Sequence, residues 1–311
     1  MKLNNRPYKN TAGEKAGLFL IGILQVPAKY VFYIIKSLRI NQWYKNILLF
    51  AGIAFSRNVT NWRMVGITFL AFFCFCVLAG SGYIINDIAD RDKDALHENK
   101  KYRPIASRRF PVKYALPIAL VLISAALAGS WMINRLFFLA ALGYLVSTLS
   151  YSFYFKKVVL VDIIAVSIGF VIRAVAGCLA VGVNISPWLV ICSFLLALFL
   201  ILNKRWHSLN VLKEQTSYAE GILEFYSTAT LDKLISIVTS SLLVAYLVYV
   251  INTNKVVMLV STVFVVYGLF RYLYLVQHMN YHAAPDKALR DRGLLISMGC
   301  WAICILMLSR I

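Results

Sequence analysis

The sequence is short of charged residues, which make up 14% of its 311 positions. A soluble domain is about half apolar and carries roughly a quarter charged residues. Here 60% of the residues are hydrophobic, and the mean hydropathy is +0.72. Long apolar runs alternate with short, strongly charged stretches, which is typical of a multi-pass helical membrane protein. The composition therefore excludes an ordinary soluble domain.

Cysteine in ligand-like spacing is also lacking. The six cysteines all lie inside apolar segments: Cys74, Cys76, Cys178, Cys192, Cys300 and Cys304. Because buried free thiols behave as small hydrophobes, we expect neither a disulfide nor a zinc site. The N-terminus also lacks the layout of a signal peptide, since residues 1–15 are polar and no small-residue cleavage site follows the first apolar stretch.

The apolar runs predict an all-α fold, a bundle of nine transmembrane helices. Each has roughly the 17–25 residues that a helix needs to cross about 30 Å of hydrocarbon. The predicted limits are 42–56, 65–85, 112–132, 135–153, 159–182, 186–203, 233–252, 256–276 and 292–309. Residues 16–36, broken by Pro27 and Lys29, are expected to lie in the membrane interface. The plan is thus an N-terminal basic arm with an interfacial helix (1–37) and a transmembrane domain (38–311).

The net charge of +19 is concentrated in particular loops. Basic residues gather in the N-terminal arm and in loops 86–111, 154–158, 204–232 and 277–291, while few occur in the other loops. The positive-inside rule places the N-terminus and these loops in the cytosol, with the helices in the cell inner or plasma membrane. Because the charge sits between apolar helices, we expect bilayer and phosphate partners and no nucleic acid.

The sharpest motif is Asn-Asp-x-x-Asp-x-x-x-Asp, residues 86–94, directly after the apolar run that ends at Ile85. If the helix continues, Asp87, Asp90 and Asp94 fall at i, i+3 and i+7, which places three carboxylates on one face. Like charges this close repel one another, and a hard divalent cation relieves the repulsion. Mg²⁺ prefers one or two carboxylates together with phosphate oxygens. We therefore predict that these aspartates, assisted by Asn86, bind a Mg²⁺–diphosphate at the membrane surface.

A basic turn follows the acidic motif. Pro104 ends any continuing helix, which leaves Lys100, Lys101 and Arg103 near the carboxylates. These cations are suited to phosphate oxygens that the metal does not hold, and Arg103 is the strongest candidate.

The acidic motif after the second of nine helices resembles the UbiA superfamily of intramembrane prenyltransferases, over residues from about 38 to the end. The resemblance implies a helical bundle around a cavity that opens laterally to lipid and is capped by cytosolic loops. Within the superfamily, the sequence is most similar to the decaprenyl-phosphate phosphoribosyltransferases. The stretches that carry this likeness include 39–46, 97–107, Tyr151-Ser152, 204–207, 223–227 and 267–272.

This resemblance implies a transfer reaction used in cell envelope biosynthesis. A 5-phosphoribosyl group would move from phosphoribosyl pyrophosphate to a polyprenyl phosphate, with Mg²⁺ as cofactor and release of diphosphate. Members that act on aromatic substrates usually carry a second aspartate-rich motif after the sixth helix. Loop 204–232 has only scattered acids there, which favours phosphoribosyl transfer.

Other polar residues near the predicted cytosolic ends are candidates for substrate binding, each with a structural alternative. They are Lys45, Asn46, Tyr151, Lys156, Asp162, Arg173, Lys204 and Arg205. Lys45 is either a phosphate contact or an interfacial anchor. Asp162 and Arg173 lie within one predicted span, about 16 Å apart along a helix, so they cannot pair directly. The cations at 204 and 205 also complement a helix dipole.

Two other functions compete with phosphoribosyl transfer. A prenyl-diphosphate-dependent aromatic prenyltransferase would use the same metal site, with a carbocation captured by an aromatic acceptor. A cation or lipid transporter would need more polar residues within the spans than Asp162 and Arg173 provide. The sequence leaves the isoprenoid length and the oligomeric state open, a homo-oligomer included.

Overall fold

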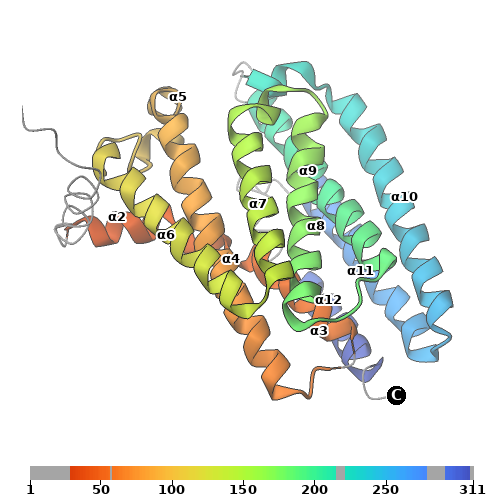
Figure 1. The fold of residues 1–311 in the computed structure, drawn as a ribbon. Helices are drawn as coiled ribbons and strands as arrows, with labels where there is room; N and C mark the ends of the chain where they lie inside the picture. The colour runs from red at the N-terminus through yellow and green to blue at the C-terminus, as the bar shows by residue number, and fades with distance from the viewer. Residues whose placement is uncertain (1–28, 57, 215–220, 279–290, 309–311) are drawn as a thin grey trace, which may run out of the picture. The chain divides into compact units, whose positions relative to one another are not determined.

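The computed structural model describes residues 29–56, 58–214, 221–278 and 291–308, and this part of the chain is helical without strands (Figure 1). The elements are α2 (Lys29–Ser37), η1 (Ile40–Phe50), α3 (Ala51–Phe55), α4 (Trp62–Ala89), α5 (Arg91–Leu96), η2 (Lys100–Tyr102), α6 (Val112–Ile133), α7 (Arg135–Phe153), η3 (Phe155–Lys157), α8 (Val161–Val181), α9 (Pro187–Glu214), η4 (Gly221–Phe225), α10 (Thr228–Thr253), α11 (Val256–His278) and α12 (Arg292–Leu308).

Seven of the described helices are long and apolar enough to cross a membrane: α4, α6, α7, α8, α9, α10 and α11. The shorter apolar helix α12 occupies the ninth predicted span. The all-helical class is therefore confirmed, whereas the count of nine full-length spans is not. The predicted interfacial segment is described only from Lys29 onwards, as α2, and residues 16–28 lie outside the described part.

The first predicted span, residues 42–56, is wrong as a single α-helix. The chain forms instead the 3₁₀ segment η1 and then the five-residue helix α3. A 3₁₀ helix rises about 2 Å per residue, so η1 covers more length per residue than an α-helix does. The polar Asn46 is buried within this segment, and its side chain binds Arg173. That tertiary contact is invisible to a hydropathy pattern, which registers only the apolar neighbours of Asn46.

The described chain divides into two compact units, each with its own core. The first contains α2, the C-terminal part of α4 from Cys76, α5, η2 and the start of α6 up to Ala126. Its core is formed by Ile84, Ile105, Phe110, Ala115, Ile118 and Ala119. One side of α2, including Tyr30 and Ile34, packs against this cluster, and the helix runs across the direction of α4 and α6 (Figure 1).

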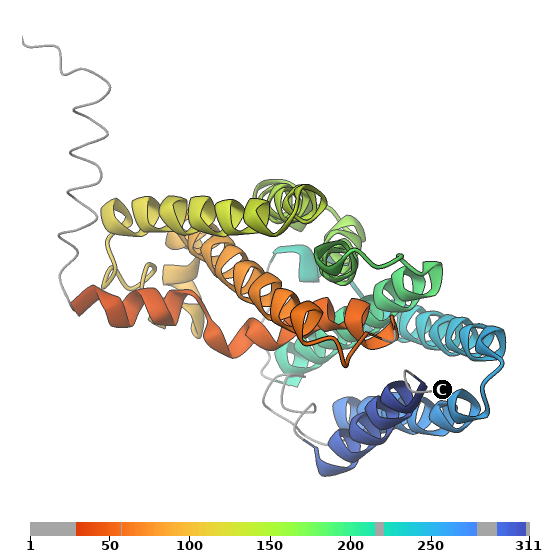
Figure 2. The same cartoon turned by 60° about the horizontal axis from the view of Figure 1, so that its bottom comes forward.

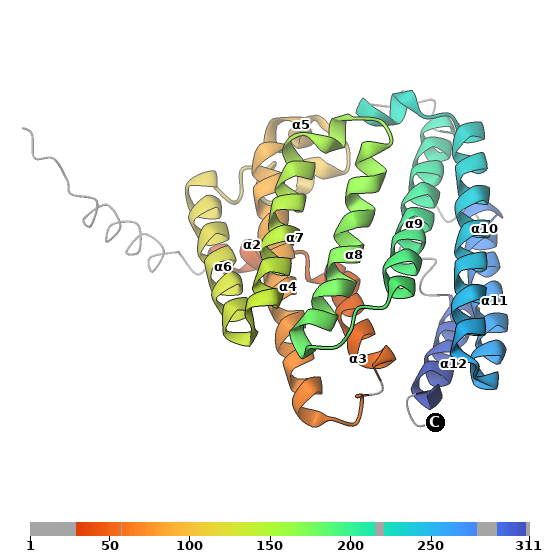
Figure 3. The ribbon, with the colours of Figure 1, turned by 45° about the vertical axis from the view of Figure 1, so that its right-hand side comes forward.

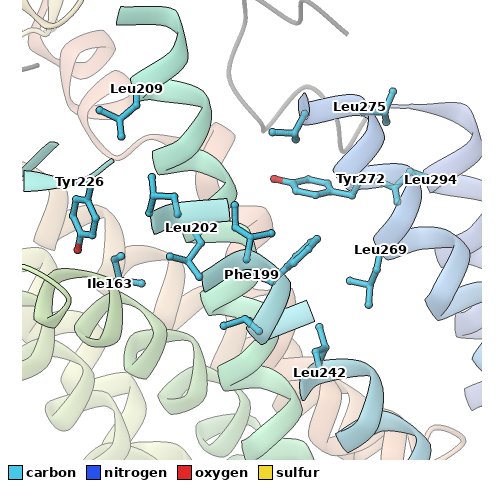
Figure 4. Packing of buried hydrophobic residues seen from close by; sticks show 14 residues of the cluster. Ile163, Phe199, Leu202, Leu209, Tyr226, Leu242, Leu269, Tyr272, Leu275 and Leu294 are labelled. Atoms are coloured by element: carbon cyan, nitrogen blue, oxygen red, sulfur yellow. The ribbon is translucent and has the colours of Figure 1, made fainter. Parts of the chain in front are cut away.

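The second unit contains Trp43–Phe75 and the chain from Leu127 onwards. Its helices pack in chain order, α7 on α8, α8 on α9, α9 on α10 and α11 on α12 (Figure 3). Viewed from the end, α11 and α12 form a closely packed pair (Figure 2). The largest cluster joins α8, α9, α10, α11 and α12 through residues such as Phe199, Leu202 and Tyr272 (Figure 4).

Backbone features stop and start the helices of this unit. Asn134 accepts a hydrogen bond from the Phe137 amide at 2.8 Å, which caps α7, and its side-chain amide donates to the carbonyl groups of Leu179 and Ala180 at the end of α8. Gly182, at φ +71°, ends α8 in the left-handed conformation that suits glycine. These local signals explain why the predicted limits of α7 and α8 agree closely with the structure.

The end of η1 and the short helix α3 lie against α8 through two glycines. A Cβ on Gly52 would meet the backbone nitrogen of Cys178 at 2.7 Å, and a Cβ on Gly177 would overlap the carbonyl group of Leu49. Backbone therefore touches backbone here, and only glycine permits that separation.

We expect Gly177→Ala to destabilise the protein by about 1–3 kcal/mol, because the added methyl group forces the η1 backbone away from α8. Thermal unfolding in detergent measures the effect. The control is Gly143→Ala on α7, where an added Cβ meets nothing within 4 Å. Equal melting temperatures for the two variants would show that the glycine contact is not needed.

Candidate active site

The acidic motif is distributed over a helix break in the first unit. Helix α4 ends at Ala89, Asp90 adopts a non-helical φ of −96° and ψ of 7°, and α5 begins at Arg91, turned away from the axis of α4 (Figures 1 and 3). Backbone hydrogen bonds still run from Asp90 to Asn86 and from Asp94 to Asp90. The expected uninterrupted helix is therefore wrong at Asp90, yet Asp87 and Asp94 still come together.

Asp87 is the most enclosed carboxylate of the motif, with a relative exposure of 2%. Its Oδ1 atom accepts hydrogen bonds from two arginines, from Nη2 of Arg39 at 2.6 Å and from Nη1 of Arg103 at 3.1 Å. A buried carboxylate needs such partners, since removing an unpaired charge from water costs several kcal/mol.

Arg103 joins the two ends of the motif. Its Nη1 atom also donates to Oδ2 of Asp94 at 2.6 Å, and Asp94 is buried too. One cationic nitrogen thus lies between two carboxylates that belong to different helices. Ile105 and Phe110 follow Arg103 in the chain and are fully buried. They hold the turn in place by packing in the same cluster as Ile84 of α4.

The remaining predicted residues of this motif are more accessible. Asn86, Asp90 and Lys100 are half-buried, and Lys101 is exposed beside the ring of Tyr102. In the described part of the chain, no three His, Cys, Asp or Glu side chains are grouped as a ready metal site. The donor chemistry nevertheless fits Mg²⁺, because the carboxylates of Asp87 and Asp94 already converge on one positively charged group.

In the second unit, Asp162 and Arg205 pair with each other. Asp162 is fully buried, and its Oδ2 atom accepts a hydrogen bond from Nη2 of Arg205 at 2.7 Å. Its Oδ1 atom accepts from the hydroxyl group of Tyr226 at 2.8 Å, and that hydroxyl accepts from the Leu160 amide at 2.8 Å. We call these four residues, Leu160, Asp162, Arg205 and Tyr226, the Asp162 network.

The Asp162 network joins three segments around the start of α8. Leu160, at φ +66°, is in a conformation that is costly for a residue other than glycine, and the hydrogen bond to Tyr226 holds its amide there. Burial raises the pKa of Tyr226 to about 12, so its hydroxyl remains protonated and able to donate to Asp162 at neutral pH.

Arg173 is buried further along α8, and each of its three side-chain nitrogens donates a hydrogen bond to a protein group. Its guanidinium donates to Asn46 at 2.7 Å, to the Tyr144 hydroxyl at 2.6 Å and to the Gly169 carbonyl at 2.8 Å. The guanidinium also lies 4.6 Å from the centre of the Tyr144 ring. These contacts match the structural alternative for Arg173, in which protein acceptors satisfy the guanidinium.

Four other predicted site residues of the second unit lie nearer the surface. Lys204 is exposed, while Lys45, Tyr151 and Lys156 are half-buried. The same unit contains an apolar cavity of about 440 Å³. Aliphatic and aromatic side chains from η1, α3 and α9–α12 line it, among them Leu48, Trp188, Tyr249, Leu269 and Trp301.

Sequence reasoning missed Arg39, Tyr144 and Tyr226 as partners of the predicted site residues. Each pairing joins residues far apart in the chain, 48 positions for Arg39 and Asp87 and 64 for Tyr226 and Asp162. The only available signal was that Arg39 and Tyr226 both lie in stretches that carry the family likeness.

In the described part of the chain, which is helical, an acidic motif paired with arginines lies at the end of a helix long and apolar enough to cross a membrane. Residues 46–298 match the UbiA prenyltransferase family, and the chain belongs to that family. It is therefore an enzyme and an integral membrane protein.

Known proteins support this assignment. A decaprenyl-phosphate phosphoribosyltransferase from Mycobacterium tuberculosis is 28% identical over 90% of this chain and 95% of its own length. One from Corynebacterium glutamicum is 28% identical over 91% of this chain and 88% of its own length. The structure of a UbiA homolog from Archaeoglobus fulgidus bound to GPP and Mg²⁺ has a TM-score of 0.69 at 18% identity, covering 90% and 100% of the two chains.

We expect Tyr226→Phe to destabilise the protein by about 1–3 kcal/mol, because it leaves the Leu160 amide without its acceptor and Asp162 without one donor. Thermal unfolding in detergent is the measurement, with Tyr154→Phe as control because Tyr154 is 72% exposed. If Tyr226→Phe melts with the wild type, the Asp162 network does not stabilise this region.

Proposed function

We propose that this protein transfers a 5-phosphoribosyl group from phosphoribosyl pyrophosphate to a polyprenyl phosphate and releases diphosphate. The observation that carries the proposal is the pair of buried carboxylates, Asp87 and Asp94, bridged by Arg103 at the end of a membrane helix. Support comes from relatives named decaprenyl-phosphate phosphoribosyltransferase that match this chain along most of its length.

In this proposal, Asp87 and Asp94 would hold Mg²⁺ together with Asp90, assisted by Asn86. Asp90 and Asn86 are half-buried and lie at the more accessible edge of the motif. When bound, the metal supplies charge neutralisation for the diphosphate. Arg103, Lys100 and Lys101 hold phosphate oxygens, and Arg103 is already oriented by its two carboxylate partners. Positioning and charge stabilisation then provide most of the catalysis.

The acceptor needs no general base. A phosphate monoester is anionic near neutral pH, so its oxygen attacks the anomeric carbon as the carbon–diphosphate bond breaks through an oxocarbenium-like state. The oxygen–carbon bond that forms replaces the bond to diphosphate, which leaves with its electron pair. This chemistry suits a motif rich in acids and cations and a chain with 4 histidines.

The apolar cavity of the second unit is suited to the isoprenoid tail, because its lining is almost entirely aliphatic and aromatic. The half-buried Lys45 and Lys156 are candidates for the lipid phosphate. We propose that this chemistry and the N-terminus lie on the cytosolic face. The concentration of basic residues in the loops that include the acidic motif supports this orientation.

Prenyl transfer to an aromatic acceptor is the second candidate. It is favoured by the similarity in fold to the Archaeoglobus fulgidus homolog that binds GPP and Mg²⁺. Both reactions would use Asp87 and Asp94 for a metal-bound diphosphate. They differ in which substrate carries the diphosphate, so product analysis separates them.

We expect the purified protein, with Mg²⁺ and a polyprenyl phosphate, to move label from phosphoribosyl pyrophosphate into the organic phase. Asp87→Asn should lower the rate at least about 100-fold, because it removes a negatively charged ligand of the metal that would bind the diphosphate. The matched control is Asp92→Asn, because the side chain of Asp92 is 86% exposed and pairs with its neighbour Arg91.

Asp92→Asn should retain the wild-type rate, and EDTA should abolish transfer. If the protein instead transfers the label of a prenyl diphosphate to an aromatic acceptor and transfers no phosphoribosyl group, it is an aromatic prenyltransferase. Equal rates for Asp87→Asn and Asp92→Asn would show that the reaction does not depend on Asp87.

A further inference from the structure

Asp87 has two arginine partners, and the function proposed above uses only one of them. Arg39, between α2 and η1, makes the shorter contact, 2.6 Å against 3.1 Å for Arg103. The inference below rests on the proposed function, because it concerns the same diphosphate.

Charge balance gives the first argument. Asp87 and Asp94 carry two negative charges, and Arg39 and Arg103 carry two positive ones, so the described ion-pair cluster is formally neutral. A divalent metal on the carboxylates adds two positive charges in a largely buried place. Buried charge of one sign is unfavourable without a counter-charge. An anion of matching charge, such as a diphosphate, restores the balance.

Hydrogen-bond geometry gives the second argument. A guanidinium group has five N–H donors in a fixed plane, which can serve a carboxylate and a phosphate together. If the carboxylate of Asp87 binds a metal, both arginines lose hydrogen bonds to its Oδ1 atom. They are then left with donors directed at the place where the metal and its ligands lie.

The setting of Arg39 holds the guanidinium in position. Its backbone is in the left-handed region, at φ +51°, and its carbonyl accepts from the Gln42 amide at 2.7 Å. The guanidinium lies 4.9 Å from the centre of the Tyr83 ring, and 21% of the side chain is exposed. A strained backbone and a stacked ring fix the group, while part of it remains accessible to a ligand.

We propose that Arg39 is a second diphosphate-binding residue, which exchanges Asp87 for phosphate oxygens when Asp87 binds the metal. Arg39 and Arg103 then hold the diphosphate from two sides, one from the junction of α2 and η1 and the other from the turn after α5. Asp87 keeps both arginines in place until the substrate binds.

The competing interpretation is that Arg39 only neutralises Asp87. The two interpretations differ in what a neutral side chain does to each ligand. A simple counter-ion competes with the metal, so removing it strengthens metal binding and leaves the affinity for diphosphate at saturating metal unchanged. If Arg39 instead binds the diphosphate, removing its charge weakens the affinity for diphosphate at saturating metal.

The experiment uses the full chain in detergent and two binding measurements without turnover. The first is Mn²⁺ affinity, followed by electron paramagnetic resonance. The second is the affinity for inorganic diphosphate at saturating Mg²⁺, followed by calorimetry. The variants are Arg39→Gln and Arg39→Lys, with Arg109→Gln, an exposed arginine of the same unit, as control.

Arg39→Gln should bind Mn²⁺ at least as tightly as the wild type and diphosphate about tenfold or more weakly. Arg39→Lys should fall between them, since it keeps the charge and loses the planar fork. Arg109→Gln should match the wild type. Unchanged diphosphate affinity in both Arg39 variants would overturn the proposal. If Arg39→Gln does not fold, the affinity of Arg39→Lys decides alone.

The two proposals fail in different ways. The wild type could bind Mg²⁺ and diphosphate with a contribution from Arg39 and yet transfer no phosphoribosyl group. That result would support Arg39 as a diphosphate-binding residue and refute the proposed reaction. Phosphoribosyl transfer by the wild type, together with wild-type diphosphate affinity in Arg39→Gln, would support the reaction and refute the role of Arg39.

Discussion

The first unit depends on one buried carboxylate. Asp87 lies at the end of an apolar helix with almost no exposure, and its charge is compatible with that position only because two guanidinium groups reach it. Each arginine comes from a different segment, so satisfying Asp87 also ties the junction after α2 and the turn after α5 to the end of α4. The same contacts that permit the charge therefore shape the candidate site.

The second unit follows the same rule. Asp162 and Arg173 lie on one helix, and each is satisfied by partners from other segments. Asp162 is joined to Arg205 and Tyr226, while Arg173 is joined to Asn46 and Tyr144. Ionisable groups inside a membrane protein are costly and are usually paired. Here the pairing anchors the non-α segment η1 and the loops at the start of α8, and it leaves the cavity lining apolar.

The helices were largely predictable from sequence, because apolar length is a local property. The limits of α7 were predicted well, since Asn134 caps the helix where the apolar run begins. The segment 42–56 was predicted wrongly, because η1 is shaped by contacts with α8 that hydropathy does not record. The acidic motif was recognised from its spacing, but the break at Asp90 was not. The partners of Asp87 and Asp162 could not be predicted, since they come from positions tens of residues away.

In the proposed site, Asp87 and Asp94 pass from their arginines to a metal while the arginines pass to a diphosphate. A structure of the protein in lipid nanodiscs, with Mg²⁺ and phosphoribosyl pyrophosphate, tests this most directly. We expect metal density between the Asp87 and Asp94 carboxylates, with Arg39 and Arg103 within hydrogen-bonding distance of the phosphate oxygens. Arginines still bound to both carboxylates, with metal and diphosphate held elsewhere, would contradict it.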